Sequence, residues 1–177
     1  MQTSWPEPVE RVAGFLREAG AEARLEEFGS GTPTAEDAAG AAGCTLEQVV
    51  KSLVLVCDGR PVVVLVPGDR RADTAKVAAS VDAAAVRVAR AEEVEDATGF
   101  APGGVAPIPL PPATRVFLDR TLLVHERVWV GAGSPHHLAS LKPTELLRLA
   151  HAEPIDAVLE RAVHTPRTPR KGDSPHA

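Results

Sequence analysis

Two short apolar runs separated by a polar turn dominate the pattern of the chain. Residues 48–67 read QVVKSLVLVCDGRPVVVLVP, in which valine and leucine are gathered on both sides of CDGRP. Such runs around a turn predict strands over residues 52–57 and 61–66, joined as a hairpin and buried on at least one face. Lys51 interrupts the apolar pattern. It either points to solvent at a helix end or serves a pocket, because an unpaired ammonium group is costly to bury.

The rest of the chain alternates helical and extended patterns. Val9, Val12 and Leu16 recur at helical spacing, and Gly43 stands where a helix is expected to end. The patterns predict helices over residues 8–19, 35–42, 90–98, 142–151 and 153–163, another helix from about residue 73, and a short helix or turn over residues 46–51. Besides the hairpin, they predict strands over residues 23–28, 86–89, 114–119, 121–125 and 127–131.

Together these elements predict one α+β domain, in which helices surround a mixed, curved β-sheet of about six or seven short strands. A length of 177 residues suits a single domain with its own core. We expect this domain to occupy residues 1–163. Residues 164–177, HTPRTPRKGDSPHA, are polar and proline-rich and are expected to form a disordered tail.

Composition and charge narrow the class of protein. Hydrophobic residues make up 44% of the chain but aromatic residues only 3%, so valine, leucine and alanine must build the core. The formal net charge of −5 argues against a broad binding surface for DNA or RNA, although it allows a local contact at the end of a nucleic acid. No apolar segment approaches the roughly 20 residues that span a bilayer, and the N-terminus lacks the features of a signal peptide. With only Cys44 and Cys57 as cysteines, we expect a cytoplasmic protein without a membrane or DNA partner.

Familiar motifs for metal binding or covalent catalysis are not found in the sequence. His125, His136, His137 and His151 lack the spacing of metal-binding motifs, so neither a metal nor another cofactor is expected. The sequence also lacks a nucleotide-binding glycine motif and a nucleophile elbow, and neither cysteine has a histidine nearby. Any chemistry must therefore use other groups.

An irregular stretch, GFAPGGVAPIPLPP at residues 99–112, contains the second candidate for chemistry. Gly103 and Gly104 stand side by side in a loop that Pro107 fixes at its far end. Consecutive glycines can present backbone N–H groups to a ligand, and the oxyanion formed in acyl transfer needs such donors. A plain turn between a helix and the next strand would use the same residues, so the loop alone leaves both interpretations open.

Four segments of the chain, taken in order, resemble a known family. They read QVVKSLVL, DTAKVAASV, ATGFAPGGVAPI and VWVGAGSPHHLASLKPTELLRL. This order is similar to that of the YbaK/ProX family, which is related to the editing domain inserted in bacterial prolyl-tRNA synthetases. The similarity covers about residues 8–159, and its most specific part is a lysine paired with a GxxxP loop after ATGF. The family lysine falls on Lys51, and the GxxxP loop falls on residues 103–107.

The resemblance implies a freestanding aminoacyl-tRNA deacylase that works without a cofactor. Such an enzyme hydrolyses the ester between a wrong amino acid and the 3′ adenosine of a tRNA, most often the tRNA for proline. Its implied partners are the acceptor end of aminoacyl-tRNA and prolyl-tRNA synthetase. The implied catalytic residues are Lys51, Gly103 and Gly104. The implied substrate-binding residues are Val105, Ala106, Pro107, Ser134, His136 and His137.

One segment departs from the family pattern. Members that clear cysteine carry a GKRGLDIE-like run after the last strand, whereas the matching region here reads GSPHHLASL. The resemblance therefore does not imply a preference for cysteine, and His136 and His137 are either replacements or exposed turn residues. Two other functions stay open. The first is a binding module of the same fold that captures aminoacyl-tRNA or a synthetase without hydrolysis, and the second is a pocket protein for a small metabolite.

Overall fold

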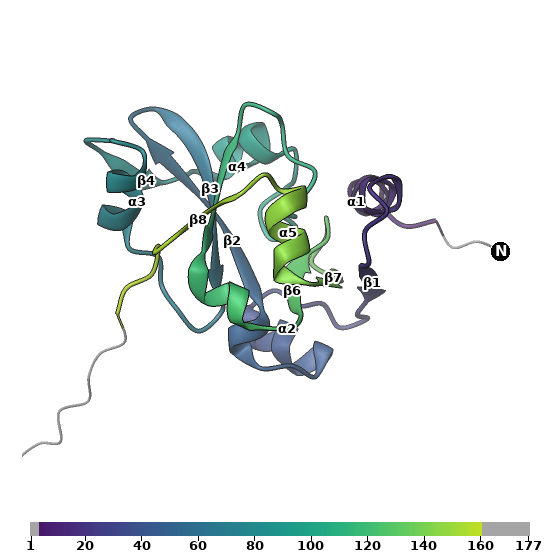
Figure 1. Ribbon diagram of the computed structural model, residues 1–177. Helices are drawn as coiled ribbons and strands as arrows, with labels where there is room; N and C mark the ends of the chain where they lie inside the picture. The colour runs from purple at the N-terminus through teal and green to yellow at the C-terminus, as the bar shows by residue number, and fades with distance from the viewer. Residues whose placement is uncertain (1–3, 161–177) are drawn as a thin grey trace, which may run out of the picture.

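The structure, a computed structural model, describes residues 4–160 and alternates short helices with short strands (Figure 1). The helices are α1 (Glu7–Glu18), α2 (Ala35–Ala42), η1 (Leu46–Gln48), α3 (Thr74–Ser80), α4 (Ala91–Thr98), η2 (Arg120–Val124) and α5 (Pro143–Leu149), where η marks a 3₁₀ helix. The strands are β1 (Arg24–Glu27), β2 (Val50–Cys57), β3 (Arg60–Pro67), β4 (Val86–Val88), β5 (Arg115–Asp119), β6 (Val128–Gly131), β7 (His137–Leu141) and β8 (Glu153–Ile155). The predicted α+β class is confirmed.

The strands form two hydrogen-bonded sheets, where the sequence predicted one. The larger sheet is mixed and has the order β4-β2-β3-β5-β8, with β2 and β3 paired antiparallel as the predicted hairpin. The smaller sheet has the order β1-β7-β6 and is antiparallel. A parallel bridge between Val49 and Trp129 links the residue before β2 to β6. The two sheets therefore meet next to Lys51, the second residue of β2.

The hairpin is buried on both faces, which explains its continuous apolar sequence. Val63 and Leu65 of β3 belong to the main core, which also includes residues of α1. Val64 and Val66 belong to a second cluster on the opposite face, together with Val77 of α3. A strand covered on both faces reads as an uninterrupted apolar run. Figure 1 shows the hairpin at the centre of the molecule, so it forms a rigid support for what lies beside it.

Residues 121–125 were predicted as a strand and instead lie in and just after η2. Asp119, which is only 1% exposed, accepts hydrogen bonds from the amide and the hydroxyl of Thr121. These bonds cap the 3₁₀ helix at its first turn. The prediction failed because TLLVH is β-prone in isolation, whereas a buried carboxylate next to it fixes a helical turn.

The helix predicted over residues 153–163 is also wrong in the part that the structure describes. Residues 153–155 form β8, which pairs parallel with β5, and the segment after it stays extended. Asp119 accepts the N–H of Ala157 at 2.8 Å and holds this segment against the larger sheet. Residues 161–163 of the predicted helix, and the predicted tail at residues 164–177, lie outside the described residues.

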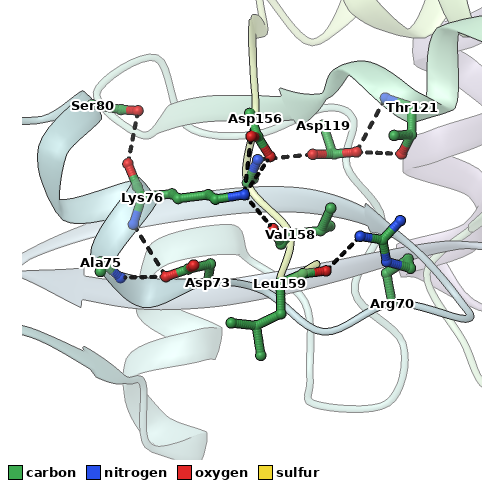
Figure 2. A network of polar contacts seen from close by, with 11 residues as sticks. Arg70, Asp73, Ala75, Lys76, Ser80, Asp119, Thr121, Asp156, Val158 and Leu159 are labelled. Carbon is green, nitrogen blue, oxygen red and sulfur yellow. Dashed lines mark hydrogen bonds and ion pairs between the residues drawn. The ribbon is translucent and has the colours of Figure 1, made fainter. Parts of the chain in front are cut away.

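A network of polar contacts fastens the last described segment to α3 and to the loop after β3 (Figure 2). Lys76 Nζ lies 2.9 Å from a carboxylate oxygen of Asp156 and donates to the Val158 carbonyl oxygen at 2.8 Å. The guanidinium of Arg70 donates to the Leu159 carbonyl oxygen. The loop that carries Arg70 is therefore fastened to the last described segment.

Candidate functional site

A pocket of about 230 Å³, here called the lysine pocket, lies where the two sheets meet. Its walls come from residues 32–38 at the start of α2, residues 49–53, the loop at residues 103–105, and residues 131–138. Of the residues predicted for the site, the structure brings four to this pocket, namely Lys51, Gly103, Val105 and Ser134. Two distant parts of the sequence, the lysine and the glycine loop, thus share one cavity.

Lys51 reaches the pocket from β2 with its ammonium group held at one point. Its Nζ donates to the carbonyl oxygen of Arg70 at 2.6 Å. Burial lowers the pKa of Lys51 below its usual 10.5, while the nearby carboxylates of Glu36 and Asp69 act in the opposite direction. An ammonium group has three N–H donors, and the Arg70 bond uses only one of them. The others can meet a ligand.

Ser52, which sequence reasoning did not place among the catalytic or substrate-binding residues, also lines the pocket. Its hydroxyl oxygen is buried and has no hydrogen-bond partner among the described residues. On the side away from β3, β2 pairs with β4 only at residues 55–57 and the bridge to β6 is at Val49, so the edge at residues 51–53 has no paired strand among the described residues. An uncovered strand edge presents N–H and C=O groups. The pocket therefore offers polar main-chain groups beside the lysine.

The two consecutive glycines have different environments. Gly103 is exposed, has a positive φ of 86° and lines the pocket. Gly104 is buried, and its N–H donates to the Ala101 carbonyl oxygen at 3.0 Å. A Cβ at Gly104 would lie 3.0 Å from the Gly133 carbonyl oxygen, so this glycine is needed for packing. The amide of Gly104 is thus already engaged, which corrects the expectation that both glycines present donors to a ligand.

Val105 connects the glycine loop to the smaller sheet. Its carbonyl oxygen lies so close to Gly131 of β6 that a Cβ at Gly131 would collide with it. Ala106 is fully buried, and Pro107 lies in a separate hollow of about 420 Å³ together with Phe15 and Ile108. Ala106 and Pro107 therefore support the loop from behind and do not line the lysine pocket.

The segment that carries the predicted Ser134, His136 and His137 is ordered around the serine hydroxyl. Ser134 Oγ and His137 Nδ1 share a hydrogen bond of 2.6 Å, and the N–H of His136 donates to the same oxygen at 3.0 Å. His137 is 3% exposed and meets the ring of Trp5 edge-on, with 5.7 Å between the ring centroids. Burial lowers the pKa of His137, which favours a neutral ring near pH 7. Only Ser134 of the three lines the pocket, with His137 behind it.

His136 points away from this arrangement. Its side chain is exposed, and Nδ1 lies 3.2 Å from the carbonyl oxygen of Phe28. Residues 137–141, whose start was read as part of a turn, form β7 at the centre of the smaller sheet. The apolar part of the pocket wall, including Ala35, Ala38 and Leu138, was also missed. These positions carry no chemical signature, and only the fold brings them together.

Two further chemical possibilities can be checked within residues 4–160. In this range, no group of three or more His, Cys, Asp or Glu side chains is arranged to hold a metal ion. No helix in the same range has the length and apolar character needed to cross a membrane.

Known proteins share this fold and this sequence pattern. A crystal structure of a protein proposed as a trans-editing enzyme for prolyl-tRNA synthetase matches with a TM-score of 0.82 and 36% identity, covering 89% of this chain and 100% of that one. A proline–tRNA ligase of Bacillus licheniformis is 33% identical over 122 residues, which is 67% of this chain and 21% of the ligase. A proline–tRNA ligase of Lactobacillus johnsonii is 36% identical over 85 residues, covering 48% of this chain and 15% of the ligase.

The chain thus matches about a fifth or less of the length of these ligases. Residues 30–149 match the family model described as the aminoacyl-tRNA editing domain. This range holds Lys51, the glycine loop and the segment around Ser134, which together make up the lysine pocket. The chain belongs to the family of aminoacyl-tRNA editing domains.

Proposed function

We propose that this protein is an aminoacyl-tRNA deacylase, whose substrate is the tRNA for proline carrying a small wrong amino acid. The observation that carries the proposal is that Lys51 and the loop at residues 103–105 line the same pocket in a member of the editing-domain family. Ester hydrolysis needs a grip on the substrate, an oriented water molecule and a place for negative charge. The lysine and the loop supply the grip on the substrate and the place for negative charge.

The size of the pocket supports a small amino acid. Its volume of about 230 Å³ is below the range of roughly 300–1,000 Å³ that is usual for small-molecule sites. Ala35, Ala38 and Gly131 contribute walls with short side chains or none. The aminoacyl group and part of the terminal ribose would therefore enter, while the rest of the tRNA stays outside.

In the proposed reaction, water attacks the carbonyl carbon of the aminoacyl ester. The bond between that carbon and the ribose oxygen breaks, and the ribose hydroxyl leaves with a proton from the water. Negative charge on the tetrahedral intermediate is stabilised by the Lys51 ammonium, with the amide of Gly103, a residue that lines the pocket, as a further donor. Among the described residues, none that lines the pocket is an aspartate, glutamate or histidine. We therefore infer that groups of the substrate itself activate the water, and that Ser134, oriented by His137, helps to position it.

The partners follow from the same proposal. The acceptor end of the tRNA is the part that would enter the pocket, and a net charge of −5 is compatible with such a local contact. Similarity to proline–tRNA ligases supports prolyl-tRNA synthetase as the second partner, acting in the cytoplasm.

The proposal is tested by measuring deacylation of tRNA for proline charged with alanine, serine or cysteine. The wild-type protein is expected to clear at least one of these, and Lys51→Ala is expected to clear none at a comparable rate. Lys142→Ala serves as the matched control, because Lys142 is exposed at the start of α5 and lies outside the pocket. Equal rates for wild type and Lys51→Ala would refute the role of the lysine. Saturable tRNA binding without turnover of any charged tRNA would identify a binding module instead.

A further inference from the structure

We propose a second subsite, which binds the single-stranded nucleotides that precede the terminal adenosine of the aminoacyl-tRNA. The site is a hollow of about 510 Å³, here called the arginine–tryptophan hollow. The residues that matter for the argument are Arg24, Glu26, Gln48, Arg127, Trp129 and Ser140. This inference rests on the proposed function and adds a place where the RNA strand is held next to the reacting ester.

The hollow lies on the same face of the smaller sheet as the lysine pocket. Leu138 of β7 pairs with Gly131 of β6, and both line the lysine pocket. Ser140, two residues further along β7, pairs with Trp129, and both line the hollow. Alternate residues of a strand point to the same face and lie about 7 Å apart. The two sites are therefore neighbours at a spacing suited to adjacent nucleotides.

The same helix separates and borders the two sites. Ala38 of α2 lines the lysine pocket, whereas Ala42, at the end of α2, lines the hollow. Ala38 and Leu138 belong to a small apolar cluster, and Trp129 packs against that cluster. An RNA strand whose terminal adenosine enters the lysine pocket would thus pass α2 to reach Trp129.

Trp129 provides a surface for a base. Its side chain is half-buried, and Phe28 meets it edge-on, with 6.2 Å between the ring centroids and 68° between the ring planes. This contact fixes the orientation of the indole. A base stacked on an aromatic side chain typically contributes about 1–3 kcal/mol without sequence preference.

Arg127 provides a fixed positive charge beside that ring. Its Nε donates to Ser140 Oγ at 2.8 Å, and its Nη2 donates to the Ser140 carbonyl oxygen at 3.0 Å. No carboxylate among the described residues forms an ion pair with it, in contrast to Arg87 and Arg90, which share Glu93. A guanidinium that is already oriented and carries uncompensated charge is suited to a phosphate group.

The charge balance of the hollow favours an anionic ligand. Arg24 and Arg127 face one carboxylate, Glu26, and Arg24 Nη1 lies 4.0 Å from it with a side chain that is 78% exposed. The chain as a whole carries a net charge of −5, so this hollow stands out as a cationic region. In the hollow behind Pro107, by comparison, Arg115 is already paired with Glu153 at 3.3 Å.

Binding at the hollow can be tested without any deacylation assay. The chain has two tryptophans, so Trp5→Phe leaves Trp129 as the only source of tryptophan fluorescence. Titration with the uncharged RNA tetranucleotide ACCA is expected to quench this fluorescence with saturation, and added salt is expected to weaken the binding. Absence of quenching at millimolar RNA would overturn the proposal, whether or not the protein is a deacylase.

The kinetic test compares two substrates, alanyl-tRNA for proline and the minimal ester 3′-alanyl-adenosine. In Arg127→Gln and in Trp129→Leu, the kcat/KM for the tRNA relative to that for the minimal ester is expected to fall about tenfold. Arg17→Gln is the matched control, because Arg17 is exposed on α1 and is not among the residues that line the hollow or the other described pockets. Thermal melting checks that each variant is folded.

The outcomes separate this inference from the proposed function. An equal loss on both substrates, or no loss on either, would refute the subsite while leaving deacylation established. Some variants could keep the wild-type ratio of kcat/KM for the tRNA to kcat/KM for the minimal ester but no longer bind prolyl-tRNA synthetase. That result would assign the hollow to a protein partner and refute the nucleotide site. If the wild-type protein cleaves neither substrate, the proposed function fails, and the fluorescence titration alone decides the subsite.

Discussion

The lysine pocket and the arginine–tryptophan hollow lie on one face of the smaller sheet but differ in almost every property of their walls. The pocket is smaller, and apart from Lys51 its walls are neutral, with several alanine, valine and glycine positions. The hollow is larger and carries two arginines, a glutamate and a tryptophan. A site that must reject large side chains benefits from close, neutral walls, whereas a site that holds a charged strand benefits from guanidinium groups.

From this difference we expect the lysine pocket to act in the reaction and the arginine–tryptophan hollow to hold the RNA. Lys51 Nζ donates to the carbonyl oxygen of Arg70, a neutral acceptor, and would offer its positive charge to the proposed substrate. Arg127 is anchored twice to Ser140, which fixes its direction. Mutations in the pocket should therefore change catalysis, and mutations in the hollow should change affinity for the RNA.

The largest effect is expected for Lys51→Ala. Loss of one donor to a developing oxyanion usually costs about 10²–10³ in kcat, so deacylation should fall by that factor. Quenching of Trp129 by ACCA should stay within about twofold of wild type, because binding in the hollow does not require the lysine. Parallel losses of turnover and RNA binding would break the division between the two sites.

An intermediate effect is expected for Gly131→Ala. A Cβ at this position collides with the Val105 carbonyl oxygen, and forcing extra volume into a packed site typically costs about 1–3 kcal/mol. Chemical denaturation should show this loss of stability, and deacylation should fall with it because the glycine loop shifts. Gly40→Ala is the matched control, since nothing lies within 4 Å of a Cβ there and alanine favours a helix interior. A Gly131→Ala variant as stable and active as wild type would contradict the packing described.

The smallest effect concerns the pH dependence of stability. Burial lowers the pKa of His137 in the folded protein below its usual 6.5, so the unfolded chain binds the proton more readily. The resulting stability is complete above about pH 6.5 and is lost as the pH falls from there toward the folded pKa. Melting temperatures measured from pH 8 to pH 5 should decline less steeply in His137→Asn than in wild type. Identical slopes would show that His137 does not titrate on unfolding.

The core of the fold could be predicted from the sequence, but the walls of the site could not. The β2–β3 hairpin could be predicted because both of its faces are buried and nearly every residue is therefore apolar. In β7, by contrast, His137 and Ser140 are polar yet buried, because the ring of Trp5 packs against His137 and the guanidinium of Arg127 lies on Ser140. A local pattern of GSPHH favours a turn, and only pairing with distant strands overrides it.

The site residues divide in the same way. Lys51 was identifiable because a charge within an apolar run demands an explanation, and the glycine loop because of its unusual composition. The role of Gly104 was not, since its N–H is taken up by a local hydrogen bond to the Ala101 carbonyl oxygen and its contact with Gly133 depends on tertiary packing. Trp129 and Arg127 were missed because a single aromatic or basic residue on a strand is ordinary until its neighbours are known.

Arg70 connects Lys51 mechanically to the last described segment of the chain. Its main-chain carbonyl accepts the bond from Lys51, and its guanidinium grips the carbonyl of Leu159 (Figure 2). A pulling force applied to the chain near Leu159 would reach Lys51 through Arg70. Arg70 thus links the two, and strain at this end of the described chain would change the direction in which the Lys51 ammonium group points.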